Sequence, residues 1–386
     1  MSTPLPSRRR FAANVLGAAA LLCATGCALG PKRGGATAPG AGEAARSFVF
    51  VGTGMGTIQI FALDEAAGSL ALKNKVSTGG VLAALAAHPF QRTLVALDER
   101  AAAVTAYTID AKAASLRLIG RGSVGGRPGR VAIDETGKYI LVSNRSNASV
   151  AVLAVRPSGQ LAAPELYPAG AGAFGLGFHP SNTLLFVANT KAGTISQMSF
   201  NAGTGALTAK PGGAVGLPAG SGPRQIVCHP GGRFVFVLNE SSNNVSVHTF
   251  DDRMGTITPL AFQMVPTLST SAGVAAPKSA QATDLALAPN GHFLYVLNRG
   301  DDSLITLSVD PETGALTFAN RTPAGGSGAT ALALDPGGKV LFVVSAGSRH
   351  LATFRLDEKT GTPELTDSTR VDQPPLSLIA LAPPPL

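Results

Sequence analysis

Tryptophan is missing from this sequence, and the other aromatic residues are scarce. Aromatic residues make up 5% of the 386 residues and charged residues 14%, whereas glycine and proline number 46 and 27. So few charges argue against long helices joined by salt bridges, and so many turn formers favour short strands. No long segment repeats its apolar residues with a helical period, so neither a helical bundle nor an α/β fold is predicted.

Cysteine is also rare, and this limits both cross-links and metal sites. Only Cys228 lies beyond the N-terminal segment that holds Cys23 and Cys27, so the mature domain is predicted to contain no internal disulfide. Cys228 lies within an apolar run, and we interpret it as a small buried apolar residue rather than a nucleophile. The histidines are scattered and no carboxylates show metal-ligand spacing, so we expect neither a metal nor any other cofactor.

Long runs of basic residues are absent beyond the N-terminus, although the formal net charge is +8. Three of these charges are Arg8, Arg9 and Arg10, and the remaining basic residues are scattered without an aromatic stacking platform. We therefore expect no nucleic-acid partner. A small anionic ligand is the predicted partner, and the protein is expected to be a monomer.

The N-terminus has the features of an export signal. The three arginines directly precede Phe11, and residues 12–26 are mostly apolar. This stretch is short for a transmembrane helix, whereas its length suits a signal peptide. Paired arginines before phenylalanine resemble a twin-arginine signal, and an ordinary secretory signal is the alternative. We expect export to the bacterial cell envelope, most simply to the periplasm.

Cys27 is a candidate lipidation site. It ends the run Ala24-Thr25-Gly26-Cys27, which is similar to a lipoprotein box, although leucine usually stands where Ala24 does. A lipid at Cys27 would be the only membrane link that we expect. Glycine, alanine and proline dominate the residues that follow, which is typical of a flexible tether. The sequence thus predicts an export signal over 1–27, a linker over 28–46 and a folded domain over 47–386.

An internal repeat predicts the fold of that domain. Each unit begins with a small apolar strand that ends at a turn, and these turns fall at His88, Asp134, His179, His229, Ala288 and Asp335. The gaps between them are 46, 45, 50, 59 and 47 residues, the size of a four-stranded propeller blade. The residue two positions before each turn is nearly always alanine or glycine, as crowded strands around an axis require.

The two ends of the domain together supply one more blade. Phe48–Gly52, Thr57–Asp64 and Leu70–Val76 are three strands of a unit that lacks its first strand, and residues 378–383 repeat the missing strand. Ring closure by this C-terminal strand would remove exposed sheet edges. We therefore predict an all-β fold, a seven-bladed β-propeller with four-stranded antiparallel blades.

Strand direction places the candidate functional residues on one face of the propeller. The start of strand one, the end of strand two and the start of strand three share this face. Arg224, Glu240 and Arg299 fall there close to the axis, together with the candidate ligand-binding residues Gln225, Asn239, Asn298 and His350. Alternatively, these are repeat-consensus turn residues in mutual salt bridges, because Asn144-Arg145 occupies an equivalent turn.

The segment from Gly222 to Glu240, with Pro223-Arg224-Gln225 at its start and Leu238-Asn239-Glu240 at its end, resembles the core signature of the seven-bladed lactonase family. This family includes bacterial 6-phosphogluconolactonase and fungal carboxymuconate cyclase. Residues 289–303 are similar to its next blade, and the resemblance covers about residues 47–383. It implies that Arg224, Glu240 and Arg299 correspond to proposed active-site residues of the family.

The sequence departs from the family pattern at several positions. Gln225 and Phe174 occupy positions that usually hold histidine, so two imidazoles that could transfer protons are replaced. The last blade has Ala329-Thr330 and Ser345-Ala346 in place of the usual Pro-Arg opening and Asn-Gln turn. The predicted fold does not depend on these residues, whereas catalysis could.

Two functions follow from these observations. The first is a lactone hydrolase acting on a sugar lactone or another organic-acid lactone, in which Arg224 and Arg299 bind an anionic group and stabilise the oxyanion. Glu240 would then orient or deprotonate the attacking water. The alternative is a non-catalytic envelope propeller that binds a small ligand or a protein, with the insertion Phe262–Thr283 as a lid or docking loop.

Overall fold

The computed structural model describes residues 47–88, 92–268, 277 and 279–382. Within these ranges all regular elements are strands, and no helix long and apolar enough to cross a membrane occurs. The predicted export signal, the linker and Cys27 lie outside the described residues.

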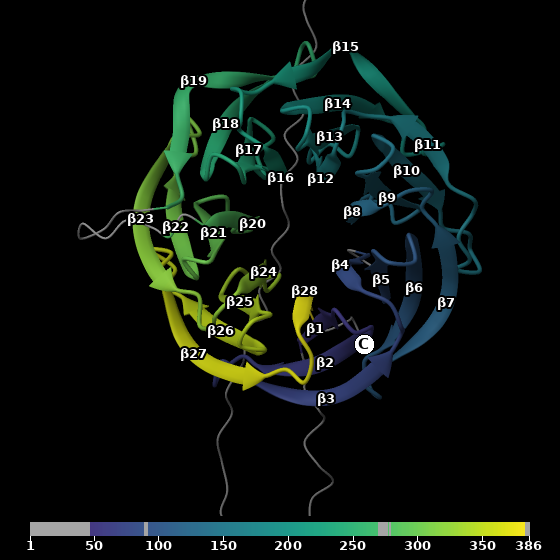
Figure 1. Ribbon diagram of the computed structural model, residues 1–386, viewed down its shortest axis with the longest axis vertical. Coiled ribbons are helices and arrows are strands. Elements are labelled where there is room, and N and C mark those ends of the chain that lie inside the picture. Colours follow the sequence, from purple (N-terminus) through teal and green to yellow (C-terminus); the bar gives the residue numbers. More distant parts are fainter. Residues whose placement is uncertain (1–46, 89–91, 269–276, 278, 383–386) are drawn as a thin grey trace, which may run out of the picture. The chain divides into compact units, whose positions relative to one another are not determined.

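The strands form seven four-stranded antiparallel sheets, arranged as blades around a central axis (Figure 1). Blade 1 contains β28 (Pro375–Leu381), β1 (Phe48–Thr53), β2 (Thr57–Asp64) and β3 (Ser69–Ser77). Blade 2 contains β4 (Leu82–Ala87), β5 (Thr93–Asp98), β6 (Ala103–Asp110) and β7 (Ser115–Ser123). Blade 3 contains β8 (Pro128–Ile133), β9 (Tyr139–Asn144), β10 (Ser149–Ala154) and β11 (Glu165–Pro168).

The remaining blades follow in chain order from the innermost strand outward. Blade 4 contains β12 (Ala173–Phe178), β13 (Leu184–Asn189), β14 (Thr194–Phe200) and β15 (Leu207–Gly216). Blade 5 contains β16 (Pro223–Cys228), β17 (Phe234–Asn239), β18 (Asn244–Asp251) and β19 (Thr256–Pro266). Blade 6 contains β20 (Gln281–Leu287), β21 (Phe293–Arg299), β22 (Ser303–Val309) and β23 (Leu316–Pro323). Blade 7 contains β24 (Ala329–Leu334), β25 (Val340–Ser345), β26 (His350–Leu356) and β27 (Pro363–Arg370). The predicted seven-bladed propeller is confirmed.

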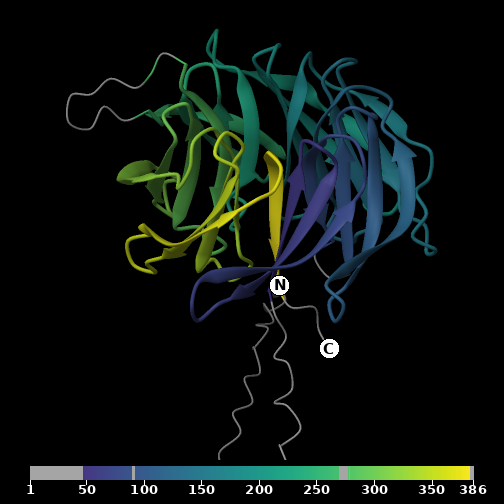
Figure 2. The same cartoon turned by 60° about the horizontal axis from the view of Figure 1, so that its bottom comes forward.

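The C-terminal strand closes the ring as the repeat predicts. β28 pairs antiparallel with β1, and its register places Leu381 opposite Phe48 and Ser377 opposite Gly52. Figure 2 shows this strand, in yellow, beside the purple strands of blade 1. Blade 1 is therefore built from both ends of the domain, and β1 does not remain as an open sheet edge.

The hydrophobic core lies between neighbouring blades rather than at a single centre. In one cluster, Phe236 and Leu238 of blade 5 pack with Leu285 and Val296 of blade 6. Second strands such as β17 are buried along their whole length, because each is covered by sheets on both faces. Outer strands such as β27 consist instead mostly of exposed and partly buried residues. The blades therefore stabilise one another through their faces.

Small residues let neighbouring inner strands approach closely. A Cβ atom on Gly177 of β12 would lie 2.9 Å from Cγ2 of Ile226 on β16. Gly177 is one of the positions where the repeat carries alanine or glycine, two residues before the turn. Packing against the adjacent inner strand is thus the physical reason for this repeated small residue.

The expected insertion over Phe262–Thr283 is shorter than predicted. β19 continues to Pro266, where Val265 pairs with Val245, and β20 already begins at Gln281. Val265 packs against the core cluster between blades 5 and 6, which explains why the strand continues this far. Of the connection between these strands, residues 269–276 and 278 lie outside the described residues.

Candidate functional site

The inner strands carry irregular pairing near the end where the candidate residues lie. The register shifts between Pro223 and Gln225 in blade 5 and between Ala173 and Gly175 in blade 4, with similar shifts in blades 2, 3, 6 and 7. A β-bulge re-aims the side chain of the extra residue. The residues inside these two shifts are Arg224 and Phe174, so the bulges orient both side chains at the same face.

Arg224 and Glu240 form an ion pair at this face. Nη1 of Arg224 donates to Oε2 of Glu240, and Nε of Arg224 donates to the carbonyl oxygen of Thr283 at 3.0 Å. The two side chains are 25% and 23% exposed, so both remain accessible to solvent. Among the described residues Oε1 of Glu240 has no hydrogen-bond partner. The alternative interpretation, in which these are turn residues in mutual salt bridges, also predicts this ion pair, so a catalytic role for the pair stays a prediction.

Arg299 has a different partner. Its Nη2 donates to Oε1 of Gln281 at 2.9 Å, and its side chain is exposed. Within the described part of the chain, it makes no hydrogen bond or ion pair with Arg224 or Glu240. The structure thus joins two of the three predicted catalytic residues, and a catalytic role for Arg299 stays a prediction.

The two candidate asparagines are buried in their own blades. Nδ2 of Asn239 donates to Oδ1 of Asn244 at 2.9 Å and to Oγ of Ser246 at 3.1 Å. Nδ2 of Asn298 donates to the Thr267 carbonyl at 2.9 Å and to Oγ of Ser303 at 3.2 Å. Both side chains are 0% exposed, so the geometry favours a structural role in the turn. Their contact with a substrate remains a prediction.

His350 begins β26 in blade 7, and its backbone pairs with Ser345 and Arg370. It is partly exposed and belongs to a different blade from Arg224 and Arg299. A substrate contact by His350 is likewise still a prediction.

Two further arginines lie beside Arg224 that the sequence analysis did not select. The guanidinium carbons of Arg224, Arg145 and Arg130 lie 4.5, 5.1 and 5.6 Å from the centre of the Phe174 ring. Each arginine also has its own carboxylate: Arg130 pairs with Asp284 at 3.1 Å and Arg145 with Glu99 at 2.5 Å. The site is therefore a cluster of three ion pairs grouped around one aromatic ring.

Burial makes these guanidinium groups poorly solvated. It lowers the pKa of Arg130 below its ordinary value, Asp284 opposes this effect, and the nearby Arg224 and Arg145 add to it. Burial also lowers the pKa of Arg145, against the opposing effect of Glu99. Both arginines remain charged at neutral pH. Burial is the main cause of both shifts and the neighbouring arginines add to it, so the guanidinium groups lie close together in a poorly solvated place although each has a carboxylate partner.

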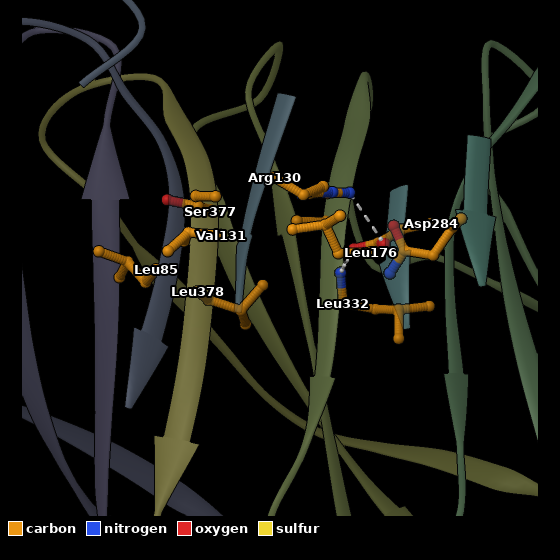
Figure 3. A pocket seen from close by; sticks show the side chains of 11 residues that line it. Leu85, Arg130, Val131, Leu176, Asp284, Leu332, Ser377 and Leu378 are labelled. Carbon is orange, nitrogen blue, oxygen red and sulfur yellow. Dashed lines mark hydrogen bonds and ion pairs between the residues drawn. The ribbon is translucent and has the colours of Figure 1, made fainter. Parts of the chain in front are cut away.

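A cavity of about 180 Å³ lies on the axis next to this cluster. Every inner strand lines it, and Figure 3 shows Arg130 and Asp284, which come from blades 3 and 6, joined by a dashed line, with leucine side chains around them. Arg130 and Gln225 border the cavity, whereas Arg224 and Glu240 are not among its lining residues. Gln225 donates from Nε2 to the Leu285 carbonyl at 3.3 Å, and its Oε1 has no partner among the described residues.

The carboxylates of Asp284 and Glu240 differ in availability. Asp284 is 4% exposed, and its Oδ1 accepts from Nη2 of Arg130 at 3.1 Å. Its Oδ2 accepts from the backbone N–H of Leu332 at 3.0 Å, which ties blade 6 to blade 7. Glu240 is more exposed, and one of its oxygens has no hydrogen-bond partner within the described part of the chain. Glu240 is therefore the carboxylate better placed to accept a proton from water.

A positional signal in the sequence could have identified Arg130 and Asp284. Four residues before each repeat turn, the blades carry Ala84, Arg130, Gly175, Gln225, Asp284 and Ala331. Charged residues of opposite sign therefore occupy an axial position that holds alanine or glycine in three of the other four blades of this set. Pairing them required knowing which blades face each other across the axis.

Neither a metal centre nor a reactive thiol is found in the described ranges. No three His, Cys, Asp or Glu residues of these ranges are grouped so that they could hold a metal ion. Burial raises the pKa of the Cys228 thiol to about 12, so it stays protonated and unreactive at neutral pH. Cys228 is partly rather than fully buried and packs against the core cluster between blades 4 and 5, which agrees with an apolar packing role.

Comparison with known proteins gives a consistent result. A family model described as "Lactonase, 7-bladed beta-propeller" matches residues 48–378. The solved structure of a periplasmic gluconolactonase from Pseudomonas aeruginosa is 28% identical, covers 88% of this chain and 100% of its own, and has a TM-score of 0.78. No curated protein matches the chain in sequence.

Two further solved structures support the fold alone. A Bacteroides fragilis protein provisionally described as a 6-phosphogluconolactonase is 20% identical over 89% of this chain and 99% of its own, with a TM-score of 0.77. A Lactobacillus plantarum protein is 22% identical over 87% of this chain and 99% of its own, also with a TM-score of 0.77.

Proposed function

Because the chain belongs to the seven-bladed β-propeller lactonase family, we propose that it hydrolyses a sugar lactone in the cell envelope. The observation that carries the assignment of the site is the Arg224–Glu240 pair, which lies at the face predicted from strand direction. The 28% identical structure is named a periplasmic gluconolactonase, which supports both a sugar lactone and an exported protein.

The geometry supports a direct hydrolytic step. The free oxygen of Glu240 takes a proton from a water molecule, and the water oxygen attacks the lactone carbonyl carbon. Arg224 stabilises the negative charge that develops on the carbonyl oxygen. The ring carbon–oxygen bond then breaks, the leaving oxygen receives the proton from Glu240, and a hydroxy acid is formed. This step needs no metal or organic cofactor.

Substitution of Glu240 tests this function. Glu240→Gln keeps the size of the side chain and its bond to Arg224 but cannot accept the proton, so kcat for glucono-δ-lactone should fall by about a hundredfold or more. The purified protein is assayed by the acid released, against the spontaneous rate. Glu312→Gln is the matched control, because Glu312 also pairs with an arginine, Arg233, but is 83% exposed.

The outcomes are distinct. Loss of turnover in Glu240→Gln with normal turnover in Glu312→Gln supports the proposal. A wild-type rate in Glu240→Gln would refute the role of Glu240. A wild-type protein that hydrolyses no sugar lactone would instead refute the proposed substrate class.

A further inference from the structure

Phe174 lies where the three guanidinium groups meet. It is the second residue of β12, 8% exposed, in the bulge of blade 4. Arg130 and Arg145 come from blade 3 and Arg224 from blade 5, so the ring lies between the two neighbouring blades. All three guanidinium carbons are within 5.6 Å of its centre.

The backbone of Phe174 is held firmly in this place. Oγ of Ser143 donates to the Phe174 carbonyl and accepts the backbone N–H of Arg130 at 2.9 Å. A Cβ atom on Gly129 would lie 2.9 Å from the Phe174 Cα, so the glycine permits this close approach of β8 and β12. The position of Phe174 is therefore well defined, whereas an arginine side chain has many rotamers and loses more conformational entropy when it is ordered.

An aromatic ring solves an electrostatic problem that an aliphatic side chain would not. Three guanidinium groups grouped this closely repel one another, and burial removes much of their hydration. The negative face of a phenyl ring attracts cations, so Phe174 offsets part of both costs. The guanidinium carbons lie over the ring, and the N–H groups of all three arginines still pair with carboxylates.

We propose that Phe174 is a positioning residue for lactone hydrolysis, because its ring holds the Arg224 guanidinium in line with Glu240 and keeps Arg130 and Arg145 beside them. The proposal rests on the function proposed for the Arg224–Glu240 pair. Phe174 itself transfers no proton. Phe174 acts through Arg224, whose interaction with the carbonyl oxygen of the lactone strengthens as that oxygen becomes negatively charged.

Replacement of the ring by an aliphatic side chain of similar size is the main test. Phe174→Leu should lower kcat for glucono-δ-lactone at least about tenfold, with a change in KM below about threefold, because the lost interaction acts mainly in the transition state. Phe174→Tyr keeps the aromatic face and should stay within about threefold of the wild type. Phe174→Met supplies a second non-aromatic variant if the leucine variant does not fold.

The matched control is Phe178→Leu. Phe178 lies on the same strand and packs against Phe200, with ring centres 5.2 Å apart, but no arginine from the described ranges lies over its ring. This variant should lose stability comparable to Phe174→Leu and keep the wild-type kcat. If Phe174→Leu folds and keeps its wild-type kcat, or if both leucine variants lose kcat equally, the positioning role is wrong.

A measurement on the arginine itself separates this proposal from the proposed function. The Nε proton of Arg224, assigned by NMR with Arg224→Lys, should show a ring-current shift in the wild type and in Phe174→Tyr, and lose it in Phe174→Leu or Phe174→Met. An ordinary shift in the wild type would overturn the proposal whatever the activity. If the shift is present but the wild type hydrolyses no lactone, the proposed function is wrong. The role of Phe174 in hydrolysis is then wrong as well, although its contact with Arg224 is confirmed.

Discussion

His248 should make the fold sensitive to mild acid. It lies in β18 of blade 5, its side chain is 0% exposed, and neither ring nitrogen has a hydrogen-bond partner within the described residues. Burial lowers the pKa of His248 to about 4, and the nearby backbone of Val235 and Ser246 opposes this only in part. In mild acid, His248 therefore binds a proton readily in the unfolded chain but not in the folded protein.

The sign and size of the effect follow from proton linkage. A free histidine has a pKa of about 6.5, so above this pH His248 is neutral in both the folded and the unfolded chain and does not change the stability. The free energy of unfolding falls as the pH drops from about 6.5 to about 4. At pH 5 the loss relative to pH 8 should be about 2 kcal/mol, and below pH 4 it should approach about 3 kcal/mol. Backbone N–H groups lower the pKa of the exposed turn carboxylates Asp310 and Asp357, whose stabilising contributions are lost only at still lower pH.

Urea denaturation at pH 8 and at pH 5 measures this effect directly. His248→Leu should reduce the difference in unfolding free energy between the two pH values by about 2 kcal/mol, even if the variant is less stable at both. His292→Gln is the control, because His292 is an exposed turn residue. If His248→Leu shows the same pH dependence as the wild type, the buried neutral histidine is not responsible and the reasoning is refuted.

Two other expectations concern the axis and the N-terminus. Asp284→Asn leaves Arg130 without its carboxylate in a buried place and should cost about 3 kcal/mol of unfolding free energy in urea; a loss below about 1 kcal/mol would contradict a buried, tightly coupled pair. In a bacterial host, the full chain should fractionate with the envelope, and Cys27→Ala should move it from the membrane to the soluble periplasmic fraction; a cytoplasmic protein would exclude export.

The fold could be predicted because a propeller repeats one local pattern. The sequence of each blade contains apolar strands, a turn residue and a small residue that faces the next inner strand. A repeat unit such as Leu285–Asn298 can therefore be recognised without knowledge of distant contacts. Closure by β28 was predictable for the same reason, since residues 378–381 fill the one strand that the N-terminal unit lacks. The residue at which β19 ends could not be predicted from the sequence, because Val265 is held in the strand by packing between blades rather than by a local turn signal.

The functional site was predictable only where its residues belong to one blade. Arg224 and Glu240 lie at the ends of paired strands, so strand direction was sufficient to bring them together. Arg299 lies in the next blade, and its side chain adopts a rotamer that donates a hydrogen bond to Gln281. Rotamers of long side chains depend on the neighbours present, and the repeat pattern does not specify them.

Sequence alone determined the ring of seven blades, the strand that closes it and the face on which Arg224 and Glu240 lie, because these follow from local patterns repeated along the chain. Tertiary structure alone decided that Arg130 reaches across to Asp284 and that three arginines gather around Phe174. The first contact joins blades 3 and 6, which are far apart in the sequence, and the second joins three consecutive blades; both depend on curvature and packing that only the closed ring provides.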